Sequence, residues 1–174
     1  DAVHLQGGQG NHIVDCTIRN FGKDGVVITG GQEHEVSNSS IYNIGLRAVV
    51  ISGGDRKKLT PAKHRLANNH IHHYGRRGTS YPGVDMDGVG IHVVHNSIHD
   101  APHTGIQFMG NDHVIELNEI HHVCSETSDA GAIYTGRDWT VRGNLIRHNF
   151  IHDVMGMNNK GDVSAIYLDD LASG

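Results

Sequence analysis

Two short patterns of apolar and polar residues alternate along the chain, and each returns six times. The first occupies residues 12–21, 35–44, 65–74, 92–101, 114–123 and 145–154, and each copy has a central isoleucine. The second occupies residues 25–31, 48–54, 83–88, 105–111, 131–137 and 164–170. Apolar residues at every second position, bounded by glycine, predict β-strands. Copies that recur every 22 to 31 residues predict stacked structural repeats.

Alignment of the copies predicts which side chains face the interior. The central residues of the first pattern are Ile18, Ile41, Ile71, Ile98, Ile120 and Ile151. In the second pattern the inward pairs are Val26 with Ile28, Val49 with Ile51, Val84 with Met86, Ile106 with Phe108, Ala132 with Tyr134, and Ala165 with Tyr167. The residues between them, such as Asp85, Gln107 and Ile133, are then expected to face outward.

One column of the first pattern carries small or amide side chains in every copy. Two residues before each isoleucine stand Cys16, Ser39, Asn69, Asn96, Asn118 and Asn149. Such side chains at a fixed place are typical of a tight turn or of a stacked hydrogen-bonding ladder.

Each repeat has room for two strands, their turns and a third short strand, and leaves no room for a helix. Parallel strands stacked about 4.8 Å apart would bury the apolar columns. We therefore predict an all-β fold, a single-stranded right-handed parallel β-helix of about six coils, where one coil is one turn of the solenoid. It is expected to span residues 1–174 as one domain that is incomplete at both ends, with further coils of the same chain outside it. Loops are expected at the insertions 55–64, 73–83 and 155–163.

Composition and charge narrow the expected partners. The chain has 19 acidic against 14 basic residues and a net charge of -5, which provides no broad basic surface for a nucleic acid. No apolar run is long enough to predict a membrane span. The 23 glycines and 16 histidines, with 5% aromatic residues, suit short strands joined by turns.

With these repeats, residues 110–139 (GNDHVIELNEIHHVCSETSDAGAIYTGRDW) and 165–174 (AIYLDDLASG) resemble the right-handed β-helix proteins of carbohydrate-active bacterial loci, among them glycoside hydrolase family 141. The resemblance implies a secreted or periplasmic enzyme that acts on plant or algal polysaccharide through two aspartates on neighbouring coils. It also points to Asp169 and Asp170 as functional residues. The fold alone does not imply this activity, because β-helices also serve as lyases, esterases and adhesins.

The expected register places acidic side chains on neighbouring coils. If residues 132–134 stack on residues 165–167, Asp129 stacks on Asp162, and His103 lies beneath Asp129. Two such carboxylates can divide the roles of proton donor and of nucleophile or base in glycoside hydrolysis. They could equally be turn-forming residues where the strands begin.

The partner of Asp129 stays open at this point. Register favours Asp162, and the resemblance favours Asp170, which stands eight positions away, or roughly 26 Å along a straight strand. Asp170 could instead form an ion pair with Arg137. The catalytic candidates are thus Asp129, Asp162 and Asp170, and the residues expected to hold the sugar are His103, Arg137, Asp169, Asp85 and Gln107.

Histidines form another column, directly after the isoleucines. Its members are His72, His99, His121 and His152, followed one residue later by His73, Asp100, His122 and Asp153. A column spreads imidazoles along a rod, whereas a metal needs ligands that converge. We therefore expect flat stacking and no metal here, with some of these side chains, together with His103, His113 and Tyr81, lining a groove that binds sugar hydroxyls.

Other functions remain open beside the glycoside hydrolase. No cofactor is expected, although calcium is possible because carboxylate oxygens suit hard cations, the candidates being Asp85, Asp87, Asp169 and Asp170. A calcium-dependent polysaccharide lyase would use Arg137 as its base. The other alternative is a non-catalytic carbohydrate-binding β-helix.

Overall fold

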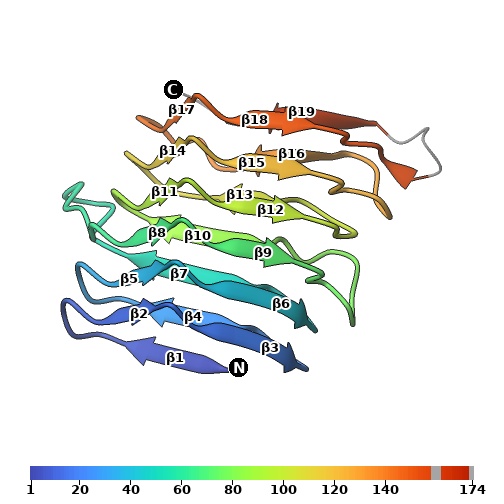
Figure 1. Cartoon of the computed structure of the whole chain (residues 1–174). Coiled ribbons are helices and arrows are strands. Elements are labelled where there is room, and N and C mark those ends of the chain that lie inside the picture. Colours follow the sequence, from blue (N-terminus) through green and yellow to red (C-terminus); the bar gives the residue numbers. More distant parts are fainter. Residues whose placement is uncertain (158–161, 173–174) are drawn as a thin grey trace.

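The computed structural model describes residues 1–157 and 162–172, and its strands wind into a regular solenoid (Figure 1). The strands are β1 (Val3–Gln6), β2 (His12–Val14), β3 (Thr17–Phe21), β4 (Val26–Thr29), β5 (Glu35–Ser37), β6 (Ser40–Ile44), β7 (Val49–Gly53), β8 (Arg65–Ala67), β9 (His70–His72), β10 (Val84–Gly88), β11 (His92–Val94), β12 (Ser97–His99), β13 (Ile106–Phe108), β14 (Val114–Glu116), β15 (Glu119–His121), β16 (Ala130–Thr135), β17 (Leu145–Arg147), β18 (Phe150–His152) and β19 (Val163–Leu168).

The strands form three parallel sheets that run along the rod. Sheet 1 is seven-stranded, in the order β1-β4-β7-β10-β13-β16-β19. Sheet 2 has the order β17-β14-β11-β8-β5-β2, and sheet 3 has the order β18-β15-β12-β9-β6-β3. Each coil contributes one strand to each sheet, and the two chain ends lie at opposite ends of the stack (Figure 1). The predicted right-handed parallel β-helix is therefore confirmed, with six three-strand coils after β1 in the described residues.

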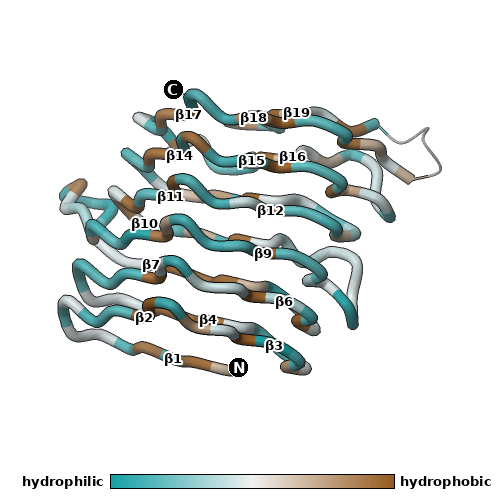
Figure 2. The backbone as a smooth tube through the Cα atoms, in the orientation of Figure 1, coloured by the Kyte–Doolittle hydropathy of each residue, from teal (hydrophilic) through white to brown (hydrophobic). Residues whose placement is uncertain are grey.

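The isoleucine column forms as predicted and runs through the interior. Ile18 pairs with Ile41, and the column continues through Ile71, Ile98, Ile120 and Ile151 on successive strands of sheet 3. The four middle members are fully buried. Apolar segments recur at the same place in each coil (Figure 2). Each isoleucine thus packs on its equivalents above and below, so the core is continuous along the rod.

The first pattern divides into two strands at a left-handed turn between sheets 2 and 3. The turn residues have φ between 51° and 56°, and they are Asp15, Asn38, Asn68, His95, Leu117 and His148. Asparagine and aspartate tolerate this conformation best among residues with a side chain. The turn lets each coil change direction within two residues.

The predicted asparagine ladder follows directly after this turn. The backbone N–H groups of Asn69 and Asn96 each donate to Oδ1 of the next asparagine, Asn96 and Asn118, at 3.0 Å. The Nδ2 group of Asn96 donates to the carbonyl of Leu66 at 3.0 Å. Asn69, Asn96 and Asn118 are 1–2% exposed. Each amide therefore satisfies buried backbone groups that the turn leaves without a strand partner.

A second interior ladder is built from histidines. His34, His64 and His113 are fully buried, and the rings of His34 and His64 stack at 5.1 Å with an angle of 9°. Nδ1 of His64 accepts the backbone N–H of His34 at 3.2 Å, and Nδ1 of His113 accepts that of Ile91 at 3.1 Å. Burial lowers the pKa of His64 and of His113, so both rings stay neutral acceptors. The expectation that His113 lines a sugar-binding groove is therefore wrong.

The register between β13 and β16 differs by one residue from the expected alignment. Ile106 pairs with Ile133, and Gln107 pairs with Tyr134. Ile133 is fully buried, while Tyr134 and Tyr167 stand opposite each other on the outer face. The expected inward position of Tyr134 and the expected outward position of Ile133 were thus wrong, since a shift of one residue exchanges the faces of a strand, whereas Ala132 is buried as expected. Inward Ile133 buries more apolar area than alanine would, and outward tyrosines give their hydroxyls polar partners.

The insertions lie at the predicted places between strands. Residues 55–64 lie between β7 and β8, with an antiparallel bridge between Asp55 and Thr60. Residues 73–83 connect β9 to β10. Part of the third insertion, residues 158–161, lies outside the described residues. Within the described part of the chain, no helix has the length and apolar character needed to cross a membrane.

The asparagine ladder gives the first testable prediction. Replacing Asn96→Ala removes the acceptor for the Asn69 N–H and leaves the Leu66 carbonyl without its partner. We expect the free energy of unfolding to fall by about 3 kcal/mol, because buried unpaired groups each cost about 1–3 kcal/mol. Chemical denaturation followed by circular dichroism measures the change. The control is the neighbouring Ser97→Ala, and a loss for Asn96→Ala no larger than for this control would contradict the account.

Candidate functional site

A cluster of tyrosine and aspartate side chains lies on the outer face of sheet 1, at its last two strands. Tyr134 in β16 and Tyr167 in β19 pack edge to face, with ring centroids 5.7 Å apart. The Tyr134 hydroxyl donates to Oδ2 of Asp169 at 2.6 Å, and the Tyr167 hydroxyl donates to Oδ1 of Asp129 at 3.1 Å. Together with Arg137, these residues form what we call the tyrosine–carboxylate cluster.

The cluster brings together carboxylates from the two ends of neighbouring strands. Asp129 directly precedes β16, and Asp169 directly follows β19. The Tyr167 hydroxyl interacts with both carboxylates. Asp129 and Asp169 stand at opposite ends of their strands, and the two packed tyrosine side chains connect them through one hydrogen bond each.

Charge in the cluster favours an ionised Asp169 and neutral tyrosines. Hydrogen bonds from Tyr134 and from the Asp170 N–H, together with Arg137, lower the pKa of Asp169. Burial and the bond to Asp169 raise the pKa of Tyr134 to about 12. Hydrogen bonds to Asp129 and Asp169 raise the pKa of Tyr167 to about 12. Both phenols therefore remain hydrogen-bond donors at neutral pH.

Asp162 and Asp170 border this cluster. The Asp129 N–H donates to the Asp162 carbonyl at 2.7 Å, so the expected neighbourhood of these residues is present in the backbone. The Asp170 N–H donates to Oδ1 of Asp169 at 2.7 Å, and the Asp170 carbonyl accepts the Arg137 N–H. Nε of Arg137 lies 4.0 Å from Oδ2 of Asp169. The guanidinium thus faces Asp169, which sequence reasoning had placed among the sugar-binding residues.

The other predicted sugar-binding residues lie at different distances from the cluster. Gln107 pairs with Tyr134 and is its direct neighbour on the next strand. Asp85 pairs with Gln107, but its carboxylate lies 3.0 Å from Nη1 of Arg47. His103 precedes β13, and its Nδ1 is shielded without a hydrogen-bond partner in the described residues. Burial lowers the pKa of His103, so the ring is neutral.

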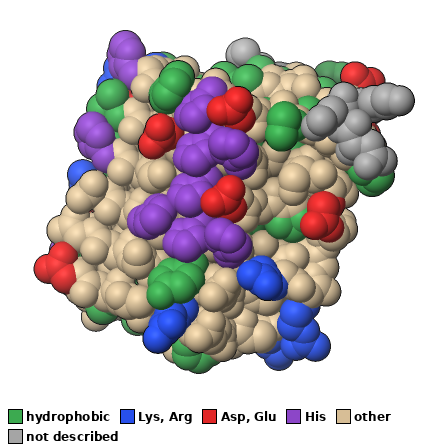
Figure 3. Space-filling view, turned by 45° about the vertical axis from the view of Figure 1, so that its right-hand side comes forward, with side chains coloured by type: hydrophobic (Ala, Val, Ile, Leu, Met, Phe, Trp, Pro, Cys, Tyr) green, Lys and Arg blue, Asp and Glu red, His purple; other side chains and the backbone are tan. Residues whose placement is uncertain are grey.

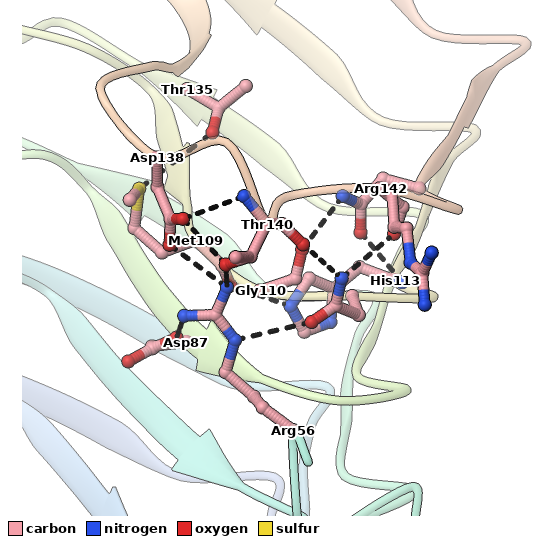
Figure 4. Close-up of polar contacts among 11 residues, drawn as sticks. Arg56, Asp87, Met109, Gly110, His113, Thr135, Asp138, Thr140 and Arg142 are labelled. Atoms are coloured by element: carbon pink, nitrogen blue, oxygen red, sulfur yellow. Dashed lines mark hydrogen bonds and ion pairs between the residues drawn. The ribbon is translucent and has the colours of Figure 1, made fainter. Parts of the chain in front are cut away.

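A second polar network joins an insertion to the coils above it (Figure 4). Arg56, in the insertion after β7, donates to Oδ1 of Asn111 at 3.2 Å, to Oδ2 of Asp138 at 3.0 Å and to Oγ1 of Thr140 at 2.8 Å. Hydrogen bonds from Thr140 and Arg56 lower the pKa of Asp138 to about 2. Sequence reasoning missed this network, because residues more than 50 positions apart meet only after the chain winds.

Three of the four carboxylates considered for calcium, all except Asp170, face a guanidinium instead. Asp85 lies against Arg47. Asp87 lies 3.8 Å from Nη1 of Arg56, and Asp169 lies beside Arg137. A cation at these carboxylates would compete with the arginines, and calcium takes six to eight oxygen ligands. The described residues bring no three carboxylates of this set to one point.

Histidines form a continuous band over sheet 3 (Figure 3). The rings of Tyr42, His72, His99, His121 and His152 stack in that order, with successive centroids 4.8, 5.1, 4.6 and 4.8 Å apart and interplanar angles of 2° to 13°. The predicted flat stacking is thus present. We call these five residues the histidine column.

Each histidine of the column is hydrogen-bonded at Nδ1 to the residue that follows it. The partners are His73 at 2.7 Å, Asp100 at 2.9 Å, His122 at 2.7 Å and Asp153 at 2.7 Å. These partners all have φ between 49° and 53°, a left-handed conformation that ends the strand. They form a second file beside the column, in which imidazoles and carboxylates alternate.

The charge of the column changes along the rod. Burial and neighbouring histidines lower the pKa of His72 to about 4 and lower that of His121. At the last coil, hydrogen bonds to Asp153 and Glu119 raise the pKa of His152. His72 and His121 are therefore neutral at pH 7, whereas the C-terminal end of the column stabilises positive charge at His152.

A groove of about 650 Å³ runs beside the second file. Insertion residues 75–79 form part of its lining, and its polar lining includes His73, Arg76, Asp100, His122, Glu126 and Asp153. His73 and His122 of the second file therefore line a groove, as expected, whereas His103, His113 and Tyr81 are not among its lining residues.

Comparison with known proteins supports the fold and leaves the activity open. The family model described as a right handed beta helix region matches residues 1–82. No curated protein and no solved structure gave a match. The matched residues extend from β1 through β9 and precede the tyrosine–carboxylate cluster. The chain thus carries right-handed β-helix repeats.

The neutral histidine column predicts a pH dependence of stability. The folded protein holds the pKa of His72 at about 4, whereas an unfolded chain binds this proton near pH 6.5. The unfolded state therefore takes up the proton first as pH falls, so this contribution is fully present above about pH 6.5 and is lost between about pH 6.5 and 4. We expect the denaturation midpoint to decrease from pH 7 to pH 5, and to decrease less in His72→Gln.

The control for this measurement is His12→Gln, on an exposed strand position at the other end of the rod. Equal slopes of the midpoint against pH in His72→Gln and in the unsubstituted protein would show that the column does not hold His72 neutral.

Proposed function

We propose that this β-helix hydrolyses glycosidic bonds in a plant or algal polysaccharide at the outer face of sheet 1. The observation that supports this most directly is that carboxylates from two neighbouring coils, Asp129 and Asp169, accept hydrogen bonds from two tyrosine hydroxyls whose rings pack edge to face. Paired carboxylates flank a scissile glycosidic bond at separations of about 5 to 10 Å, and the proposal requires Asp129 and Asp169 to lie within this range.

The two carboxylates take different roles in this proposal. Asp169 is held ionised by its hydrogen bonds and by Arg137, which suits a nucleophile or a general base. Asp129, at the exposed start of β16, donates a proton to the leaving glycosidic oxygen. Tyr167 holds Asp129 in position and Tyr134 holds Asp169, each through a hydrogen bond from its hydroxyl. Asp162 and Asp170 remain candidates for the second carboxylate, since both adjoin the cluster through the backbone.

Neighbouring side chains provide sugar-binding groups. The Arg137 side chain is 74% exposed and can donate to sugar hydroxyls. Gln107 stands beside Tyr134 and adds an amide. The tyrosine rings offer apolar faces on which a sugar ring can stack. His103 and Asp85 lie further along the same sheet and would contact a longer chain. A secreted or periplasmic location, and polysaccharide as substrate, follow from the resemblance stated above.

One observation favours a non-catalytic carbohydrate-binding protein as a second candidate. The Asp169 side chain is only 10% exposed, and hydrogen bonds engage both of its oxygens. A carboxylate so enclosed could serve to hold the tyrosines rather than to attack a sugar. Binding without hydrolysis would then be the function.

The test compares hydrolysis and binding across a panel of plant and algal polysaccharides. We expect Asp129→Asn and Asp169→Asn each to lower kcat by about 10²- to 10⁴-fold, the usual contribution of a positioned acid or base. Binding of the same polysaccharide, followed by affinity electrophoresis, should persist. Release of reducing ends measures the reaction.

A matched control is Asp112→Asn, which removes one carboxylate at an exposed left-handed position that asparagine also adopts. Hydrolysis by Asp129→Asn at the rate of the unsubstituted protein would refute the role of Asp129. Binding without release of reducing ends would establish the non-catalytic alternative. Unsaturated sugar ends and loss of activity with a chelator would indicate the calcium-dependent lyase.

A further inference from the structure

We propose that the C-terminal end of the histidine column is a binding site for a divalent transition metal, with Glu119, His121 and His152 as ligands. Among the described residues, this is the one group of three or more histidine, cysteine, aspartate or glutamate side chains whose potential ligand atoms converge, all within 4.8 Å of one another. The site lies on sheet 3, away from the tyrosine–carboxylate cluster of sheet 1.

The backbone places all three side chains on one face. Glu119 and His121 are two residues apart in β15, so both point outward from the sheet. His152 in β18 pairs with His121. Two coils therefore present an imidazole each, and the carboxylate stands diagonally across from His152. Glu119 is 49% exposed and the His152 side chain 30%, and Nε2 of His152 is shielded without a hydrogen-bond partner in the described residues.

The distances are close to those that a metal requires. The rings of His121 and His152 stack at 4.8 Å with an angle of 13°, and Oε1 of Glu119 lies 3.6 Å from Nε2 of His152. Zinc bonds nitrogen and carboxylate oxygen at about 2.0–2.2 Å, so two ligands in tetrahedral geometry are about 3.4 Å apart. Side-chain rotations that bring the ligand atoms up to about 1.4 Å closer would complete the site.

The residues next to the ligands orient both imidazoles. Nδ1 of His152 is hydrogen-bonded to Oδ2 of Asp153 at 2.7 Å, and Nδ1 of His121 to Nδ1 of His122 at 2.7 Å. When each ligand ring donates its Nδ1–H in these bonds, its Nε2 carries the lone pair that a metal needs. Histidine ligands in metal sites usually donate their other N–H to a carboxylate, as His152 does here.

The local charge also favours a cation. Carboxylate oxygens of Glu119 and Asp153 lie 3.6 Å and 2.7 Å from the two ring nitrogens of His152. Negative charge this close stabilises a cation at the ring.

The rest of the column lacks this combination. The residue that corresponds to Glu119 is Ser97 on the preceding coil and His70 on the coil before that. Nε2 of His70 lies 2.6 Å from Nε2 of His99, so these two nitrogens share a hydrogen bond. Two imidazole nitrogens and one carboxylate oxygen, with open positions for water, suit Zn²⁺, Co²⁺ or Ni²⁺ better than Ca²⁺.

Isothermal titration of the metal-free protein with Zn²⁺ tests the proposal. We expect one ion per chain, and binding at least about 100-fold weaker in His121→Ala and in His152→Ala. Asp153→Asn should weaken binding by about 10- to 100-fold, as changes to groups that orient a ligand do. The absorbance of Co²⁺ depends on its ligands, and titration with Co²⁺ should rank the variants in the same order of affinity. The control is His148→Asn, an exposed histidine in a left-handed turn on the last coil, which should bind like the unsubstituted protein.

Absence of Zn²⁺ binding at millimolar concentration would overturn the proposal, as would equal affinity in His152→Ala. Far-ultraviolet circular dichroism of each metal-free variant shows whether it remains folded. Zn²⁺ should raise the thermal midpoint of the unsubstituted protein and of His148→Asn but not that of His152→Ala. These measurements need no polysaccharide, so their outcome is independent of the proposed hydrolysis.

Discussion

The parallel hydrogen bonding of each coil to the next is the interaction on which the rest of the structure depends. It places every residue of a strand beside its equivalent one coil away, so a residue type that recurs in the sequence becomes a file along the rod. An isoleucine file forms the core, and an asparagine file satisfies the backbone at the turns. A file of buried histidines does the same before the strands of sheet 2. Each coil of the β-helix thus supplies hydrogen-bond partners for the buried backbone groups of its neighbours.

The same constraint produces both candidate sites. On sheet 3 it stacks imidazoles, and burial together with neighbouring rings lowers the pKa of His72 and His121. At the last coil, hydrogen bonds to Asp153 and Glu119 instead raise the pKa of His152. On sheet 1 it places two tyrosines one above the other, and their hydroxyls reach carboxylates at opposite ends of the strands. In each case the candidate site lies at the coils where a file changes from one residue type to another.

Sequence alone was enough for the fold, because the isoleucine and asparagine columns repeat the same residue types in every copy. It was not enough for the register between β13 and β16. There the chain reads Ala130-Gly131-Ala132 before Ile133, and small residues leave two alignments one position apart. Choosing the wrong one turned Tyr134 inward and hid the tyrosine–carboxylate cluster. The contacts of Arg56 also escaped prediction, since an insertion has no fixed place in the repeat. Glu119 was not predicted as a site residue, because the column was recognised by its histidines and Glu119 lies two residues before one of them.

A disulfide cross-link tests this register most directly. In a background of Cys16→Ser and Cys124→Ala, which removes both free thiols, Gln107→Cys is combined with either Tyr134→Cys or Ile133→Cys. Paired residues on neighbouring parallel strands have Cα atoms about 4.8 Å apart, within the range of about 4.4–6.8 Å that a disulfide spans. The account predicts that oxidation cross-links 107 to 134 and leaves 107 and 133 reduced, because Ile133 points to the interior. Cross-linking of 107 to 133 in preference to 134 would contradict it.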